Sequence, residues 1–229
     1  MASGQCLNKQ KTSIMFSSNG RNEDWDRIVE ELGGRVQNNY ERYLGLPTLV
    51  GRSKYNTFRG IKDRIWLKIN NWKNYFLSPA GKEVLLKAVV QAIPSYHMNV
   101  FALPKKLCKE IDVLMSKFWW GYKDNDKKIN WMKWSRMGES KFYGGLGFRE
   151  LESFNKALLA KQCWRALINP NSLAARVLKD KYHKHASVLE AKLGTNPSLI
   201  WRSLWASLEL LRDGLVSRVG NGKRIRVGG

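Results

Sequence analysis

Apolar residues recur every three or four positions along much of the chain, the spacing of helices that bury one face. The clearest stripe consists of Phe58, Ile61, Ile65, Ile69 and Trp72. A second helix is predicted from residue 79 to residue 93, because Ser78 is a good N-cap, Pro79 suits the first helical position and Pro94 ends the run. A third stripe comprises Leu107, Ile111, Leu114, Met115 and Phe118.

The second half of the chain repeats this pattern. Residues 150–168, 172–184 and 198–212 predict three more helices, separated by turn residues. Residues 216–227 predict a small hairpin around an Asn-Gly turn. The first 50 residues differ, with short polar strands and one helix over residues 24–32, ended by Gly33-Gly34. The sequence therefore predicts a mainly α fold with a few short strands near its two ends.

The charge of the chain favours a polyanionic partner. Its 229 residues hold 40 Lys and Arg against 19 Asp and Glu, a formal charge of +21, and 43% of them are hydrophobic, which suits a folded core. Cations that displace counterions from a phosphate backbone gain free energy, so nucleic acid is the natural partner. A membrane surface is the less favoured alternative, since no long uncharged apolar span is present.

Several basic residues are placed to contact phosphates. Lys62, Arg64, Lys68 and Lys73 fall outside the apolar stripe of their helix and are expected to stay in solvent. The other predicted contacts are Lys11, Arg52, Lys54 and Lys82.

Other patterns give little support to a cofactor or metal site. The three cysteines are far apart, which favours a reducing compartment over a disulfide framework. His183 and His185 lack a cysteine partner at zinc-finger spacing. The glycines at 144, 145 and 147 lack the context of a nucleotide-binding loop and predict a hinge.

Four tryptophans in the middle of the chain have two interpretations. They could pack in a core, which is the favoured one, or stack on bases. They are Trp119, Trp120, Trp131 and Trp134.

Five short strings, in order, carry a family resemblance. They are Ser3-Gly4-Gln5-Cys6-Leu7-Asn8-Lys9-Gln10-Lys11, Tyr43-Leu44-Gly45-Leu46-Pro47, Phe118-Trp119-Trp120-Gly121, Gly144-Gly145-Leu146-Gly147-Phe148-Arg149 and Phe154-Asn155-Lys156-Ala157-Leu158-Leu159-Ala160-Lys161-Gln162. Together they resemble the part of plant non-LTR, LINE-type retroelement reverse transcriptases that follows the catalytic aspartates. The resemblance covers nearly the whole chain.

This resemblance implies a division of the chain. Residues 1–50 would be a palm remnant, in which Tyr43, Leu44, Gly45, Leu46 and Pro47 resemble the primer grip. Residues 51–121 would be a helical thumb, residues 122–147 a linker or hinge, and residues 148–229 a C-terminal helical region that stops before the family's zinc-binding segment. Lys11 matches a lysine that lies beside the incoming triphosphate in the family.

The resemblance also implies what the chain lacks. Polymerases of the family hold two divalent metals with carboxylates that include an Asp-Asp pair, and no such pair occurs in this sequence. We therefore expect a fragment that binds RNA, DNA or an RNA–DNA hybrid and does not polymerise alone, with no cofactor of its own. The missing polymerase portion is a possible partner. Localisation stays open, and would be nuclear if the chain follows the parent element.

Two alternatives to this interpretation stay open at this point. The chain could be an RNA-binding or scaffolding protein derived from a retroelement, or a gene remnant without function. A reading frame upstream that encodes the aspartate hairpin would favour the reverse transcriptase interpretation. A start of translation at Met1 would favour the first alternative.

Overall fold

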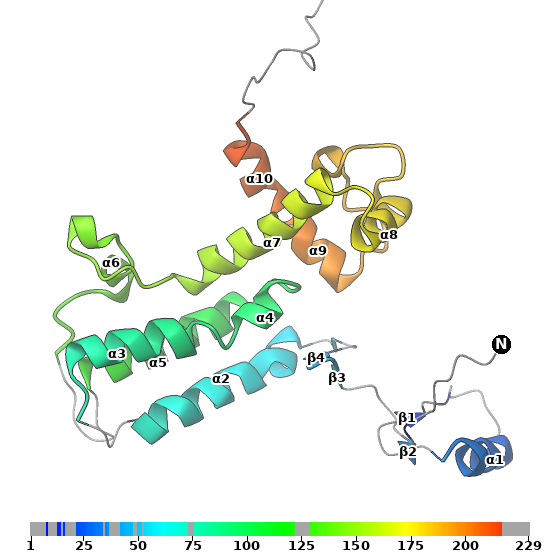
Figure 1. Ribbon diagram of the computed structural model, residues 1–229, viewed down its shortest axis with the longest axis horizontal. Helices are drawn as coiled ribbons and strands as arrows, with labels where there is room; N and C mark the ends of the chain where they lie inside the picture. Colours follow the sequence, from blue (N-terminus) through cyan, green and yellow to red (C-terminus); the bar gives the residue numbers. More distant parts are fainter. Residues whose placement is uncertain are drawn as a thin grey trace, which may run out of the picture. The chain divides into compact units, whose positions relative to one another are not determined.

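The computed structural model in Figure 1 is mainly helical, as the sequence predicted. It describes residues 8, 13–14, 16, 22–33, 35–36, 42–47, 50–51, 53–72, 76–121 and 129–216, so the predicted hairpin at residues 216–227 lies almost wholly outside the described residues. The chain divides into two compact units, Met1–Ser53 and Lys54–Gly229. The finer boundaries predicted at residues 121 and 147 stay predictions.

The described residues of the first unit form one helix and two pairs of short strands. They are α1 (Asn22–Leu32), the parallel pair β1 (Ser13–Ile14) and β2 (Arg35–Val36), and the antiparallel pair β3 (Arg42–Tyr43) and β4 (Leu46–Pro47). The predicted helix is confirmed, and Gly33 follows it with a φ of 63°. Leu44 and Gly45 join β3 to β4 with φ values of 50° and 79°. Two successive left-handed residues are typical of the tight turns that join antiparallel strands, so the Tyr43–Pro47 string forms a hairpin.

The first half of the second unit is built on two long helices. Its elements are α2 (Lys54–Trp72), α3 (Pro79–Leu85), the π-helix η1 (Leu86–Val90), α4 (Ser95–Met98) and α5 (Lys105–Trp120). The predicted stripe of α2 is buried through Phe58, Ile61, Ile65 and Ile69. Along their lengths, α2 and α5 contact each other in the same order: Tyr55 meets Lys106 and Trp72 meets Phe118. The two helices therefore run side by side in the same direction.

The helix predicted for residues 79–93 is shorter and less regular than expected. Ser78 caps it as predicted, because its Oγ accepts a hydrogen bond from the Gly81 amide at 3.2 Å. The α-helix then changes into the π-helix η1 and ends at Val90, and turns lead through Pro94 into α4, which the sequence pattern did not predict. Proline restricts the residue before it to extended backbone and lacks an amide, so a helix cannot continue easily into Pro94.

The second half of this unit closes around a tryptophan. Its elements are α7 (Leu151–Ile168), α8 (Leu173–Tyr182), the 3-10 helix η3 (Val188–Glu190), α9 (Leu199–Trp205) and α10 (Leu208–Gly214). Trp201 is fully buried among Leu159, Cys163 and Leu204. The single helix predicted for residues 198–212 is in fact two, because the chain turns at Ser207, whose buried hydroxyl donates to the Leu204 carbonyl oxygen at 2.7 Å.

Residues 129–150, which precede α7, are folded against α3 and η1. They contain α6 (Trp134–Met137) and the 3-10 helix η2 (Lys141–Tyr143). At Gly145 a Cβ atom would lie 2.1 Å from the Glu139 carbonyl oxygen, so the backbones meet too closely for any side chain. Lys87 of η1 donates to the Leu146 carbonyl oxygen and to Glu83, which also pairs with Lys141 at 2.9 Å. The glycine string thus forms a packed turn.

A buried amide on α7 joins the two halves of the unit. Asn155 is 4% exposed, and its Nδ2 donates to the carbonyl oxygens of Met98 and Phe101 at 2.9 and 3.0 Å. Its Oδ1 accepts from the Leu103 amide at 2.8 Å. The Phe154–Gln162 string therefore contains the residue that fixes the turn between α4 and α5 on α7.

Candidate nucleic-acid interface

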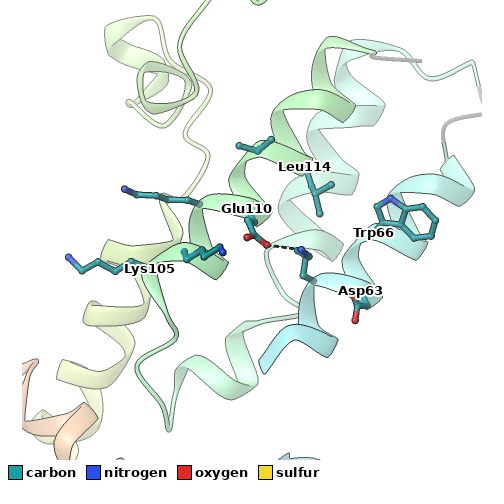
Figure 2. A pocket seen from close by; sticks show the side chains of 9 residues that line it. Asp63, Trp66, Lys105, Glu110 and Leu114 are labelled. Carbon is teal, nitrogen blue, oxygen red and sulfur yellow. Dashed lines mark hydrogen bonds and ion pairs between the residues drawn. The ribbon is translucent and has the colours of Figure 1, made fainter. Parts of the chain in front are cut away.

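An open groove of about 840 Å³ runs between α2 and α5. Figure 2 shows its lining, in which Asp63 and Trp66 come from α2 and Lys105, Glu110 and Leu114 from α5. The remaining lining residues are Lys62, Lys106, Lys109 and Val113. The groove therefore combines four lysines with an aromatic and aliphatic wall.

A clamp of three polar side chains crosses the groove from one helix to the other. The Lys62 Nζ lies 2.6 Å from Glu110 Oε2, and the Tyr55 hydroxyl donates to the same oxygen at 2.6 Å. Hydrogen bonds to Glu110 and Tyr55 raise the pKa of Lys62, and the bonds from Lys62 and Tyr55 lower the pKa of Glu110. The expectation that Lys62 stays free in solvent is wrong, because this ammonium is committed to a carboxylate on the neighbouring helix.

The lysines of α5 differ in how far their charge is compensated. Lys105 pairs with Glu152 of α7 at 2.6 Å. Lys106 lies over the ring of Tyr55, with its Nζ 5.2 Å from the ring centroid, and Lys109 is exposed. Among the described residues, neither Lys106 nor Lys109 forms an ion pair. These two ammonium groups supply the positive charge of the groove that is available to an anion.

The apolar wall of the groove is exposed. The Trp66 side chain is 47% exposed and Val113 is 52% exposed, while Leu114 lies half-buried between them and the core. Trp66 follows Lys62 by one helical turn on the groove side of α2. Large exposed apolar side chains next to uncompensated cations mark surfaces that bind another molecule.

The predicted basic residues of α2 lie on two different flanks of the helix. Lys62 and Arg64 are two positions apart, so their side chains point about 200° apart around the helix axis. Arg64 and Lys68 are exposed on the flank away from the groove, and Lys54 is exposed at the start of the helix. The structure therefore does not bring Lys62, Arg64 and Lys68 together on one surface. Whether any of them binds nucleic acid stays a prediction.

The remaining predicted contacts are placed only in part. Lys82 on α3 donates to the Trp119 carbonyl oxygen at 3.2 Å, at the end of α5. Lys11, Arg52, Lys73 and the Tyr43 side chain lie outside the described residues. Sequence reasoning missed the lysines of α5, although their positions beside the apolar stripe beginning at Leu107 carried the same signal that singled out Lys62.

Three of the four central tryptophans are packed or half-buried, and one is exposed. Trp119 and Trp134 both pack on the buried ring of Phe148, at centroid distances of 5.6 and 4.9 Å, and Trp120 is half-buried. The favoured core assignment is wrong for Trp131, which is 81% exposed. It lies in the irregular segment before α6, where none of the described residues covers it.

A second carboxylate of α5 lies in an unusual environment. Asp112 lines a smaller cavity of about 380 Å³ together with Lys117, Lys133 and Trp134. Burial, assisted by the nearby negative charge of Glu150, raises the pKa of Asp112 to about 7, against a hydrogen bond from Trp134 that lowers it. This carboxyl group titrates near neutral pH.

The part of the chain that the structure describes shows no cluster of three or more His, Cys, Asp or Glu suited to a metal ion. Within that same part, no helix is long and apolar enough to cross a membrane.

The chain is similar to two proteins of Arabidopsis thaliana. Over 137 residues it is 44% identical to an uncharacterized mitochondrial protein, a match that covers 59% of this chain and 89% of the relative. The chain belongs to the family of that mitochondrial protein. Over 186 residues, 79% of the chain, it is 35% identical to a protein named "Putative ribonuclease H protein". It covers 30% of that longer relative, and so spans about a third of its length.

No protein-family model matches the chain. The two matches support the broader part of the resemblance, a chain derived from a plant retroelement.

Proposed function

We propose that the chain is part of a plant retroelement reverse transcriptase and that it binds the backbone of nucleic acid in the manner of a polymerase thumb. The five strings resemble that family in order, and the name of the longer relative refers to ribonuclease H, an activity on nucleic acid. The sequence lacks an Asp-Asp pair, so the proposed role on its own is binding without polymerisation. The rest of a polymerase is then the natural partner.

The observation that carries this proposal is the α2–α5 groove. Lys106 and Lys109 are the lysines of its rim that form no ion pair in the described structure. Phosphates in the groove would meet these two charges without first breaking an ion pair, whereas Lys62 and Lys105 are already paired. Backbone contacts of this kind position a nucleic acid without selecting its sequence.

A salt series tests the proposal. Binding of the chain to an RNA–DNA hybrid, to duplex DNA and to single-stranded RNA is measured as the salt concentration rises. We expect affinity to fall steeply, and Lys106→Gln with Lys109→Gln to flatten the plot of log affinity against log salt by about 0.7 to 0.9 for each lost contact. The matched control is Lys179→Gln with Lys184→Gln, which removes the same charge from exposed positions in and just after α8.

The outcomes separate the alternatives. Equal slopes for the two double variants would show that only total charge matters and would remove the groove from the interface. Absence of binding at low salt would contradict the proposal as a whole and favour a remnant without function.

A further inference from the structure

We infer that the α2–α5 groove takes an unpaired nucleic-acid strand, with a base stacked on Trp66 and the adjoining phosphates on Lys106 and Lys109. This rests on the proposed function and specifies its ligand. The three side chains line one groove, but Trp66 comes from α2 and the two lysines from α5.

The alignment of the helices orders these groups along the groove. Because α2 and α5 run in the same direction, Lys106 lies near Tyr55 at the start of both helices, the Lys62–Glu110 clamp follows, and Trp66 lies opposite Val113 and Leu114. Lys106 and Leu114 are eight positions apart, a rise of about 12 Å along the axis. The cationic end and the aromatic end are therefore two parts of one short track.

The apolar end favours an unpaired strand over a duplex. A duplex keeps its bases stacked inside and presents phosphates and sugars, so the exposed ring of Trp66 would gain little from it. Unpaired bases offer a free π-face, and proteins that bind single strands combine aromatic platforms with a positively charged path for the backbone. The groove volume of about 840 Å³ also falls within the range of about 300–1,000 Å³ typical of sites for small molecules, which suits nucleotide units rather than a whole double helix.

The two acidic residues of the groove are paired with basic residues, so they do not oppose the binding of a phosphate backbone. Glu110 is neutralised by Lys62, so it does not place an unpaired negative charge in the path of the phosphates. Asp63 likewise has Arg59 at 4.0 Å. An acidic peptide could use the two free lysines but has no flat ring for Trp66 to stack on, unless it carries aromatic residues.

The test separates base stacking from charge. Two single strands with the same number of phosphates are compared, oligo(dT) and an abasic strand. We expect the chain to bind oligo(dT) more tightly, and Trp66→Ala to weaken oligo(dT) binding about tenfold while leaving abasic binding unchanged, since stacking on an aromatic contributes about 1–3 kcal/mol per base. Trp66→Phe, which keeps a ring, should retain most of the affinity and exclude misfolding as the cause.

Two further variants complete the design. Trp131→Ala removes an exposed tryptophan outside the groove and should change neither affinity. Lys106→Gln with Lys109→Gln should weaken both strands equally. The inference is overturned if Trp66→Ala lowers affinity for both strands equally, or lowers neither. It is also overturned if a polyglutamate peptide competes with oligo(dT) and its own affinity falls as much when Trp66 is replaced by alanine. If the lysine variant changes no affinity, the proposed function itself fails.

Discussion

Two helical tryptophans in the second unit end in opposite environments. Trp201 on α9 is fully buried, stacks on Tyr182 at 4.7 Å and donates its indole N–H to the Leu193 carbonyl oxygen at 3.2 Å. Trp66 on α2 is 47% exposed in the groove. Both lie on helices that bury an apolar stripe. The difference is that the chain between α8 and α9 wraps over Trp201, and no described element covers Trp66.

This contrast separates two uses of the same side chain. A covered tryptophan contributes to folding, because its large apolar area leaves water when the chain folds. An exposed tryptophan leaves its apolar area in water, where a ligand can bury it on binding. The closed region around Trp201 should therefore respond to substitution through stability, and the α2–α5 groove through binding.

The largest expected effect comes from removing the covered ring. Trp201→Ala should lower the free energy of unfolding by about 3–5 kcal/mol, because it leaves a cavity and an unpaired Leu193 carbonyl. Trp66→Ala should lower it by less than about 1 kcal/mol. Urea unfolding followed by far-UV circular dichroism measures both. Similar losses of unfolding free energy for the two variants would contradict the proposed difference between the buried and the exposed tryptophan.

The next effect tests the joint between the two regions. Asn155→Ala should cost about 3 kcal/mol, because the Met98 and Phe101 carbonyl oxygens and the Leu103 amide lose a buried partner. Asn171→Ala, at an exposed position before α8, should stay within about 0.5 kcal/mol of the parent. Denaturant unfolding measures the free energy of unfolding of both variants. If Asn155→Ala leaves it unchanged, the joint between the two regions does not depend on this amide.

A smaller effect concerns Asp112, whose pKa is raised to about 7 in the folded chain from an ordinary value of 3.8. The folded state then holds a proton that the unfolded state releases, so stability falls as pH rises from about 4 to about 7 and changes no further from this group above that. Asp112→Asn should remove this loss and stabilise the chain at pH 8 by roughly 1–2 kcal/mol, since partial exposure reduces the full effect.

The control for that change is Asp180→Asn on the exposed face of α8, where the pH dependence of stability should stay as in the parent. Thermal unfolding measured at several pH values follows both variants. The change in stability between pH 4 and pH 7 should be more favourable in Asp112→Asn than in the unchanged chain. An equal or less favourable change in the variant would contradict the environment assigned to Asp112.

The smallest expected effect is at the clamp. Glu110→Gln removes the negative charge that pairs with Lys62, so this lysine becomes available to phosphates. Affinity for single-stranded RNA should rise a few-fold, and the slope of log affinity against log salt concentration should become steeper by about 0.7. Because the pKa of Glu110 is lowered, the pair stabilises the fold above the ordinary carboxyl pKa and loses that effect in acid. An unchanged salt slope would place Lys62 outside the interface.

Local signals in the sequence predicted most of the helices. The apolar stripe of α2, the Ser78 cap and the stripe of α5 each depend on residues within a few turns of one another, so they can be recognised without knowing the fold. The break at Ser207 and the short helix α4 were missed, because a single buried hydroxyl and a proline turn do not alter an apolar pattern enough to show where one helix ends.

The sequence by itself determined a basic, mainly helical chain of the same family as the Arabidopsis mitochondrial protein, with amphipathic stripes and lysines beside them. Only the tertiary structure decided which charges are free. Lys62 and Glu110 are 48 positions apart and pair because α2 and α5 become neighbours, while Lys106 and Lys109 form no ion pair with any described residue. Charge compensation and the covering of an aromatic ring depend on distance in space, and an amphipathic pattern records only which side of each helix faces the core.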